Sequence, residues 1–219
     1  MPIKHSLIVC HPEATSFTMA IAHRYAETVG RFRHQVEVRD LYRLGFDPLL
    51  KAEERPGAPD HAIAQDVVAE LGALAGTDIF VLVYPLWFGA PPAAIKGYIE
   101  RVFGAEFPFS SETTRHRHPL LAGKRLVSLT VSGSMSAWLD EKGVLLSLRN
   151  LFEQYLADIF GMTAVDHVHL DGVIPGLPDL EYRQLLLQVE DVAKAVMANH
   201  QVALRVPPNP IKLSASVRH

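Results

Sequence analysis

Hydrophobic residues along the chain follow two alternating patterns, one typical of strands and one typical of helices. Apolar runs or alternating stretches predict five strands, at residues 3–10, 35–41, 79–84, 124–132 and 163–170. Between them, apolar residues recur every three or four positions. This spacing predicts helices at residues 17–33, 60–74 with a cap at Asp60, 92–103, 143–160 and 180–200. Strands that alternate with helices are typical of an α/β fold with a parallel sheet.

The polarity of the strands predicts their order in the sheet. Residues 3–10, 79–84 and 124–132 are almost continuously apolar, as strands buried on both faces are. Residues 35–41 alternate and residues 163–170 carry polar side chains, so both are expected at the edges. We therefore predict a doubly wound, five-stranded parallel sheet in the order 2-1-3-4-5. This is the flavodoxin-like arrangement, whose ligand lies where the strand order reverses, between strands one and three.

The composition is that of an ordinary folded protein. Of 219 residues, 48% are apolar and 21% are charged, which allows one domain over residues 1–200 and a proline-rich tail or arm over 201–219. The net charge of −3 offers no basic patch for nucleic acid, and the short basic run at 115–118 is expected in a solvated loop. No apolar run reaches membrane-spanning length and no leader precedes the first strand, so we expect a cytoplasmic protein without a membrane span.

The single cysteine, Cys10, excludes an intrachain disulfide and a cysteine-based metal site. Its place at the end of the first strand favours a small buried side chain over a reactive thiol. Histidines with metal-compatible spacing occur at His116 and His118 and at His167 and His169. The first two fall in a predicted loop and the second two on an edge strand. We therefore expect all four to be solvated and no metal to be bound.

Three loops that follow strands one, three and four are expected to meet. Residues 11–18 bring hydroxyls and amides to a helix start, where the helix dipole favours an anion. Residues 85–91 hold large aromatics, and residues 130–138 form a small-residue turn that a ligand can approach closely. An anion cradle, an aromatic wall and backbone donors together suit a flavin. Each loop alone has a simpler explanation: helix capping by Thr15 or Ser16, a cover over the sheet end, and a plain turn.

No glycine-rich dinucleotide fingerprint, P-loop or nucleophile elbow occurs in the sequence. The three loops instead resemble those of the NAD(P)H:quinone oxidoreductase (DT-diaphorase-like) flavoproteins. The motifs are His11-Pro12-Glu13 with Ser16-Phe17, Pro85-Leu86-Trp87-Phe88-Gly89 with residues 96–103, and Thr130-Val131-Ser132-Gly133 in place of a Thr-Thr-Gly-Gly turn.

The resemblance covers most of the chain. It implies a homodimer with a flavin at the dimer interface, FAD being favoured and FMN the alternative. It also implies a two-electron, ping-pong reaction in which NAD(P)H delivers hydride to the flavin and a quinone or similar acceptor then takes it.

The resemblance also assigns roles to matching residues. The flavin phosphates would be held by His11, Ser16, Phe17 and Thr18. The isoalloxazine would contact Pro85, Leu86, Trp87 and Phe88, and its pyrimidine edge would contact Thr130, Ser132 and Gly133. Phe107 and Phe109 resemble the segment that reaches over the partner's flavin.

The chain departs from the family at several positions. Thr18 stands where Asn is frequent, and the Tyr and His that follow the glycine turn in mammalian-type enzymes are absent. Trp138, near the tyrosine position, and Lys142, the nearest cation, remain as catalytic candidates, without an evident proton relay.

Two functions stay open from the sequence. The first is a flavin-dependent NAD(P)H:acceptor oxidoreductase, which the aromatic loop favours. The second is a flavodoxin-like regulatory or ancillary subunit that binds flavin without significant turnover, which the missing Tyr and His favour. An electron-carrier flavodoxin fits poorly, because such carriers are usually shorter and strongly acidic.

Overall fold

Five parallel strands form one sheet in a computed structural model of the chain, which describes residues 2–105, 107 and 118–205. The strands are β1 (Lys4–Val9), β2 (Gln35–Asp40), β3 (Ile79–Pro85), β4 (Arg125–Val131) and β5 (Ala164–Leu170). They lie in the order β2-β1-β3-β4-β5, and every neighbouring pair is parallel. The predicted sheet is therefore confirmed, including its two edge strands.

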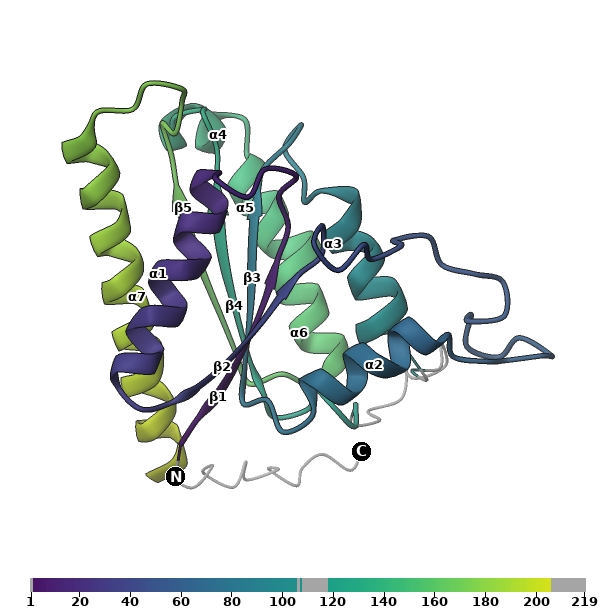
Figure 1. The fold of residues 1–219 in the computed structure, drawn as a ribbon. Helices are drawn as coiled ribbons and strands as arrows, with labels where there is room; N and C mark the ends of the chain where they lie inside the picture. The colour runs from purple at the N-terminus through teal and green to yellow at the C-terminus, as the bar shows by residue number, and fades with distance from the viewer. Residues whose placement is uncertain (1, 106, 108–117, 206–219) are drawn as a thin grey trace, which may run out of the picture.

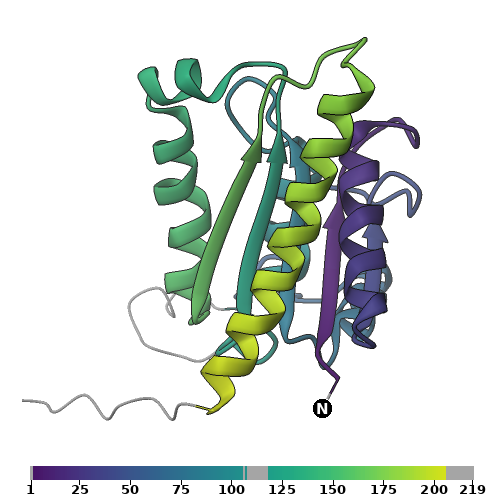
Figure 2. The same ribbon diagram turned by 90° about the vertical axis from the view of Figure 1, so that its left-hand side faces the viewer.

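Helices cover both faces of this sheet, as Figure 1 and Figure 2 show. On one face, α1 (Phe17–Arg31) and α7 (Asp179–Arg205) lie side by side. The other face carries α2 (Gln65–Leu74), α3 (Ala93–Tyr98) with the π-helix η1 (Ile99–Phe103), and a second composite helix. That composite consists of α5 (Val144–Leu148), the π-helix η3 (Arg149–Gln154) and α6 (Tyr155–Phe160), preceded by the short α4 (Ser136–Glu141).

The alternation of side chains along β3 divides the core into two layers. Phe80 and Leu82 pack against α2, α3 and the composite helix. Val81 and Val83 pack against α1 and α7 on the opposite face. All four side chains are fully buried, as a central parallel strand between two helical layers requires.

Several helix boundaries differ from the sequence prediction. α2 begins at Gln65 rather than at a cap at Asp60, because backbone hydrogen bonds such as His61 N to Ala58 O (3.2 Å) hold the preceding residues in turns. α4 was not predicted, since it is too short to show a helical period. The predicted helix at 143–160 contains the π-helical segment. α7 continues over 201–205, which were predicted as tail, and residues 206–219 lie outside the described residues.

The long connection between β2 and α2 is held against α3 and η1 by one buried cation. The side chain of Arg101 is 1% exposed and donates to both carboxylate oxygens of Glu54, at 2.8 and 2.6 Å, and to both of Asp66, at 2.7 and 2.9 Å. The same connection also packs closely against α3 at Gly97. A Cβ at this position would lie 2.2 Å from the carbonyl oxygen of Pro48, so only glycine fits. A segment without regular structure is thereby fixed in place.

Cys10 and His118 are both buried. Burial raises the pKa of the Cys10 thiol to about 12, as the predicted small buried side chain implies. His118 corrects the expectation of a solvated loop. Its Nε2 donates to the carbonyl of Phe103 (2.7 Å), its Nδ1 accepts from backbone amides at 3.1 Å, and burial lowers its pKa. The rest of the basic run, 115–117, lies outside the described residues.

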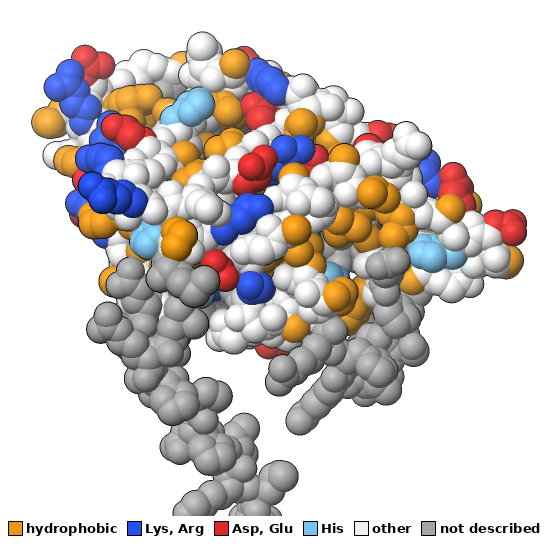
Figure 3. Space-filling view, turned by 60° about the horizontal axis from the view of Figure 1, so that its bottom comes forward, with side chains coloured by type: hydrophobic (Ala, Val, Ile, Leu, Met, Phe, Trp, Pro, Cys, Tyr) orange, Lys and Arg blue, Asp and Glu red, His pale blue; other side chains and the backbone are white. Residues whose placement is uncertain are grey.

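On the face drawn in Figure 3, acidic and basic side chains are interspersed, which leaves no single-sign charged surface on that face. None of the helices within the described residues is both long and apolar enough to cross a membrane.

Candidate functional site

A cavity of about 200 Å³ lies at the carboxyl ends of β1, β3 and β4. The sheet order produces this position, because β1 and β3 are neighbours whose following helices cover opposite faces. The lining residues are His11, Phe17, Thr18, Pro85, Leu86, Trp87, Val131, Ser132, Gly133 and Val173. The three loops are thus brought together, while the predicted cofactor residues Ser16, Phe88 and Thr130 lie outside the lining.

The first loop presents free amides at the start of α1. Ser16 is the N-cap, and its Oγ accepts from the amide of Met19 (3.3 Å). Among the residues that the structure describes, the amides of Phe17 and Thr18 have no acceptor. Unpaired amides and the dipole of a fifteen-residue helix together form a binding site for an anion such as a phosphate.

Arg43, which the sequence did not single out, fixes the backbone of this loop. Its guanidinium donates to the carbonyl oxygens of His11 (2.8 Å) and Pro12 (2.9 Å), and lies 3.7 Å from the carboxylate of Asp40. No local motif marks this residue, because the contact forms only when β1 and β2 pair. The cation therefore holds the turn in one shape and adds positive charge beside the free amides.

The second loop places an aromatic wall on the cavity. Trp87 and Ala90 exchange two backbone hydrogen bonds, at 3.1 and 3.2 Å, around Phe88 and Gly89, which both adopt positive φ. The Trp87 ring packs against the His11 ring with 5.8 Å between centroids. Phe88 does not line the cavity and is fully exposed, and its φ of 54° is unusual for a bulky residue.

The third loop contributes Ser132 and Gly133, whereas Thr130 is turned toward β5. Thr130 is buried, and its hydroxyl contacts the imidazoles of His167 (2.7 Å) and His169 (2.8 Å). In the described part of the chain, the amide of Gly133 has no acceptor. The hydroxyl of Thr130 is thus paired with two histidines of β5, and the contact of Thr130 with the flavin edge stays a prediction.

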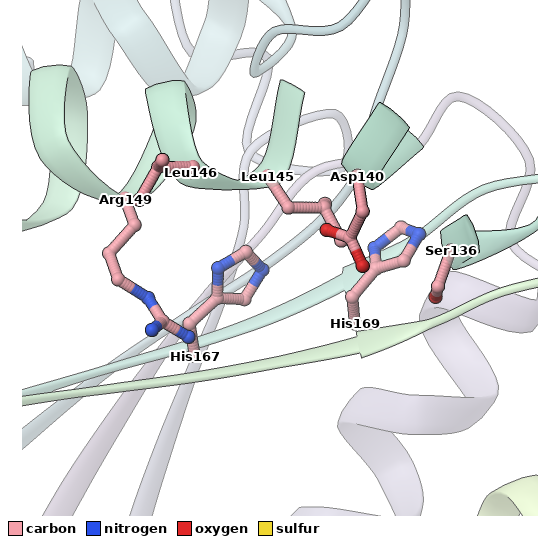
Figure 4. Close-up of a pocket in the computed structure, with 7 residues that line it drawn as sticks. All are labelled: Ser136, Asp140, Leu145, Leu146, Arg149, His167 and His169. Carbon is pink, nitrogen blue, oxygen red and sulfur yellow. The ribbon is translucent and has the colours of Figure 1, made fainter. Parts of the chain in front are cut away.

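A second cavity, of about 420 Å³, lies between the end of β5 and the helices α4 and α5. Figure 4 shows its lining, where His167 and His169 rise from β5 toward Asp140 and Arg149. The expectation that these histidines are solvated is wrong for His167, whose side chain is 3% exposed because the composite helix covers this face of the edge strand. Within the described residues, no group of three or more His, Cys, Asp or Glu side chains is arranged to hold a metal.

The remaining predicted site residues lie away from the first cavity. Trp138, on α4, is 52% exposed, and the amine of Lys142 pairs with Glu141 at 2.9 Å. Phe107 is 9% exposed and packs inside its own chain, with its ring centroid 5.3 Å from that of Phe160. Phe109 lies outside the described residues.

The residues around the first cavity fit a flavin. Free amides at Phe17 and Thr18 suit a phosphate, and the free amide of Gly133 suits a ring carbonyl. Leu86 and Trp87 offer an apolar and aromatic surface for a flat heterocycle. The donors and the wall therefore occur on one cavity in the arrangement that a flavin nucleotide needs.

Comparison with known proteins agrees with this fold. Residues 4–191 match the family model for the flavodoxin-like fold. A protein named uncharacterized NAD(P)H oxidoreductase from Haemophilus influenzae is 32% identical, over 75% of this chain and 81% of that protein. NAD(P)H dehydrogenase [quinone] 1 of Rattus norvegicus is 31% identical, over 63% of this chain but only 57% of the rat enzyme.

Among solved structures, the NAD(P)H:quinone oxidoreductase from Methanothermobacter marburgensis has a TM-score of 0.76 and 23% identity, and it covers 90% of this chain and 98% of its own. The match of the family model to nearly the whole described domain, together with the sheet order and the cavity at the β1–β3 switch point, leads to one conclusion. The chain belongs to the flavodoxin-like fold family.

Proposed function

We propose that this chain is a flavin-dependent NAD(P)H:quinone oxidoreductase that transfers two electrons as hydride in a ping-pong sequence. The observation that carries the proposal is the first cavity, which is lined both by the start of α1 with its free amides and by an aromatic wall. The relatives' names and the resemblance of all three loops to this class support it. FAD as the flavin and a cytoplasmic location stay predictions of the sequence.

A bound flavin would accept hydride from NAD(P)H and pass it to the acceptor. The protein's own residues would hold and orient the partners. The amides of Phe17 and Thr18 would bind the phosphate, and Arg43 would keep their loop from moving. Trp87 and Leu86 would exclude water from one face of the ring, and Gly133 would donate to its edge.

The proposed enzyme is a homodimer, and two observations support this assembly. A cavity of about 200 Å³ is below the range of roughly 300–1,000 Å³ that is usual for complete ligand sites. Beside it, Phe88 is fully exposed in a left-handed conformation that costs free energy. A second copy that packs on this loop would bury the ring and complete the cavity.

The test is a visible absorbance spectrum of the purified protein, followed by release and chromatographic identification of the flavin. We expect one flavin per chain, bleaching of its absorbance by NADH or NADPH, and recovery on addition of a quinone. Release of the nicotinamide product before the quinone is added supports the ping-pong order.

A protein that neither contains nor takes up FAD or FMN overturns the proposal. A protein that binds flavin but is not reduced by NADH or NADPH supports the regulatory subunit instead. The exposed positions of Trp138 and Lys142, away from the cavity, are the observation that keeps this second function open.

A further inference from the structure

A line of polar side chains joins the two cavities through the sheet edge. The hydroxyl of Thr130 bridges Nε2 of His167 (2.7 Å) and Nδ1 of His169 (2.8 Å). Nε2 of His169 lies 3.0 Å from Oγ of Ser132, which lines the first cavity. At the other end, Nδ1 of His167 lies 3.2 Å from a carboxylate oxygen of Glu153. Hydrogen bonds therefore link His167 to the first cavity, and the carboxyl group of Glu153 lies in contact with the other end of this line.

The chemistry of these groups fixes how their hydrogens are placed. A hydroxyl has one hydrogen, so Thr130 donates to one imidazole and accepts from the other. Ser132 Oγ donates to the carbonyl of Ser134 at 2.9 Å. With the Ser132 hydrogen directed at Ser134, one arrangement of the other hydrogens is possible. Nε2 of His169 donates to Ser132, and Thr130 donates to Nδ1 of His169. Nε2 of His167 in turn donates to Thr130. Nδ1 of His167 then shares one further proton with the carboxyl group of Glu153.

The opposite setting holds one proton fewer. Ser132 then donates to His169, His169 donates to Thr130 through Nδ1, and Thr130 donates to His167. His167 in turn donates through Nδ1 to the ionised Glu153. Passing from one setting to the other moves a single proton along the line and keeps the contacts between His167, Thr130, His169 and Ser132, while the hydrogen bond from Ser132 to the carbonyl of Ser134 is exchanged for one to His169. The structure thus contains a two-state path for one proton.

Glu153 is an unusual residue for a core position. It is completely buried, and neither carboxylate oxygen has a hydrogen bond among the described residues. Its nearest basic group is His167, and it lies in the π-helical segment η3, a local form that is frequent at functional sites. Beside it, Tyr84 Oη and Ser128 Oγ are also buried without a partner in the described residues. Burial and the charge of Glu153 raise the pKa of Tyr84, so this phenol stays neutral. Because an isolated buried carboxylate costs much free energy, a carboxyl group buried beside His167 is better explained by a role in function than as a structural support.

The second cavity gives this line a route to solvent. His167 and His169 both line it (Figure 4). Burial and the neighbouring His167 lower the pKa of His169 to about 4, against the opposing effect of two carboxylates, so its imidazole is neutral near pH 7 and can both donate and accept. The titratable and charged groups that face the two histidines are Tyr84 on β3, Asp140 on α4, Arg149 and Glu153 on η3, and Asp171 after β5.

We propose that the line Glu153–His167–Thr130–His169–Ser132 carries a proton between the second cavity and the flavin cavity. It would supply the proton that the reaction consumes. The inference rests on the proposed function: NAD(P)H + H⁺ + quinone → NAD(P)⁺ + hydroquinone. In this balance a C–H bond of the nicotinamide breaks, its hydride supplies both electrons and one hydrogen, the path supplies the second hydrogen, and two O–H bonds form on the acceptor. Three residues pass the proton on to Ser132 without touching the flavin or the acceptor themselves: His167, Thr130 and His169.

The first test is Thr130→Val, which removes the bridging hydroxyl and keeps the shape of the side chain. The flavin-loaded protein is reduced with NADH or NADPH, and then mixed in weak buffer with menadione and a pH-indicator dye. We expect proton uptake to slow at least about a hundredfold, the lower end of what loss of proton transfer by a positioned group causes. Flavin content should stay at the wild-type level. Thr130→Ser, which restores the hydroxyl, should restore the rate.

Thr28→Val is the matched control, because Thr28 is equally buried and its hydroxyl donates to the carbonyl of Arg24 (2.8 Å) on α1, away from both cavities. It should leave the rate of proton uptake unchanged. Wild-type proton uptake in Thr130→Val overturns the inference.

The second test does not depend on turnover. In ¹⁵N-labelled protein, imidazole nitrogen shifts report which ring nitrogen carries the hydrogen. We expect His167 and His169 to change tautomer together in one titration step, and to do so separately in Thr130→Val. Independent titration in the wild type overturns the path. A wild type that contains flavin but does not oxidise NADH or NADPH overturns the proposed function alone, since this titration still decides the path.

Discussion

Replacing Arg101 by methionine should destabilise the fold by about 3–5 kcal/mol, the usual cost of removing one partner from a buried ion pair. The reason is the carboxylate of Glu54, which is 5% exposed and would be left without its cation. With a urea dependence of ~2 kcal/mol per M, such a loss lowers the unfolding midpoint by ~2 M. Equilibrium unfolding in urea at pH 7, followed by far-UV circular dichroism, measures it.

Two comparisons make the Arg101 prediction specific. Lys96→Met, five residues earlier on α3, breaks an exposed pair with Glu100 and should cost less than about 1 kcal/mol. Adding Glu54→Gln to Arg101→Met should recover part of the loss, because no uncompensated charge then stays buried. If Arg101→Met costs no more than Lys96→Met, the buried pair does not stabilise the connection and the reasoning is refuted.

The pH dependence of the same variant has a definite sign. Arg101 lowers the pKa of both Glu54 and Asp66 below their ordinary values of 4.5 and 3.8. A lowered carboxyl pKa contributes stability above the ordinary value, and that contribution is lost as the pH falls through the lowered pKa. The difference between wild type and Arg101→Met should therefore be complete above pH about 4.5 and shrink in more acidic solution.

Three further predictions concern the site and the core. Trp87→Ala should raise the flavin dissociation constant at least about fivefold in a fluorescence titration, since an aromatic contact is worth about 1 kcal/mol beyond its area; Phe32→Ala, an exposed ring at the far end of α1, should not change it. Gly97→Ala should lower the free energy of unfolding in urea by about 1–3 kcal/mol, because the new Cβ meets the backbone of Pro48. Gly30→Ala, with open space around it, should raise this free energy by up to about 1 kcal/mol. A similar effect at both positions would contradict the close packing at Gly97. Burial lowers the pKa of His5 to about 3 from an ordinary 6.5, so the unfolded chain binds a proton that the folded chain does not, and stability should fall as the pH drops from 6.5 to 3; a His5→Gln variant with the same slope over that range would show that another group causes it.

The fold was predictable because it depends on features that are periodic along the chain. Continuous apolar runs mark the inner strands, and the alternating 35–41 and polar 163–170 stretches mark the edges. The same order of strands predicts which loops meet. The position of the first cavity at the ends of β1, β3 and β4 follows from it.

What the sequence did not predict depends on contacts across the sheet. The sequence has no Tyr and His after the glycine turn, and His167 and His169 reach Thr130 only because β5 pairs with β4. The polar side chains at 167 and 169 are visible in the sequence, but polar residues are also expected on a strand at the edge of a sheet. Arg43 and Glu153 were missed for the same reason, since each acts on a partner far away in sequence.

The neighbouring positions of α1 and α7 determine when the chain can finish folding during synthesis. These helices form one layer of the core, joined by the contacts of Arg24 and Arg31 with Glu190, at 3.5 and 3.0 Å. A ribosome releases the first helix early and the last one late, so one face of the sheet lacks half its cover until residues near Val189 and Val196 have emerged. Nascent chains that stop before this point expose the apolar face of a parallel sheet, and such truncated products are expected to aggregate or to be degraded.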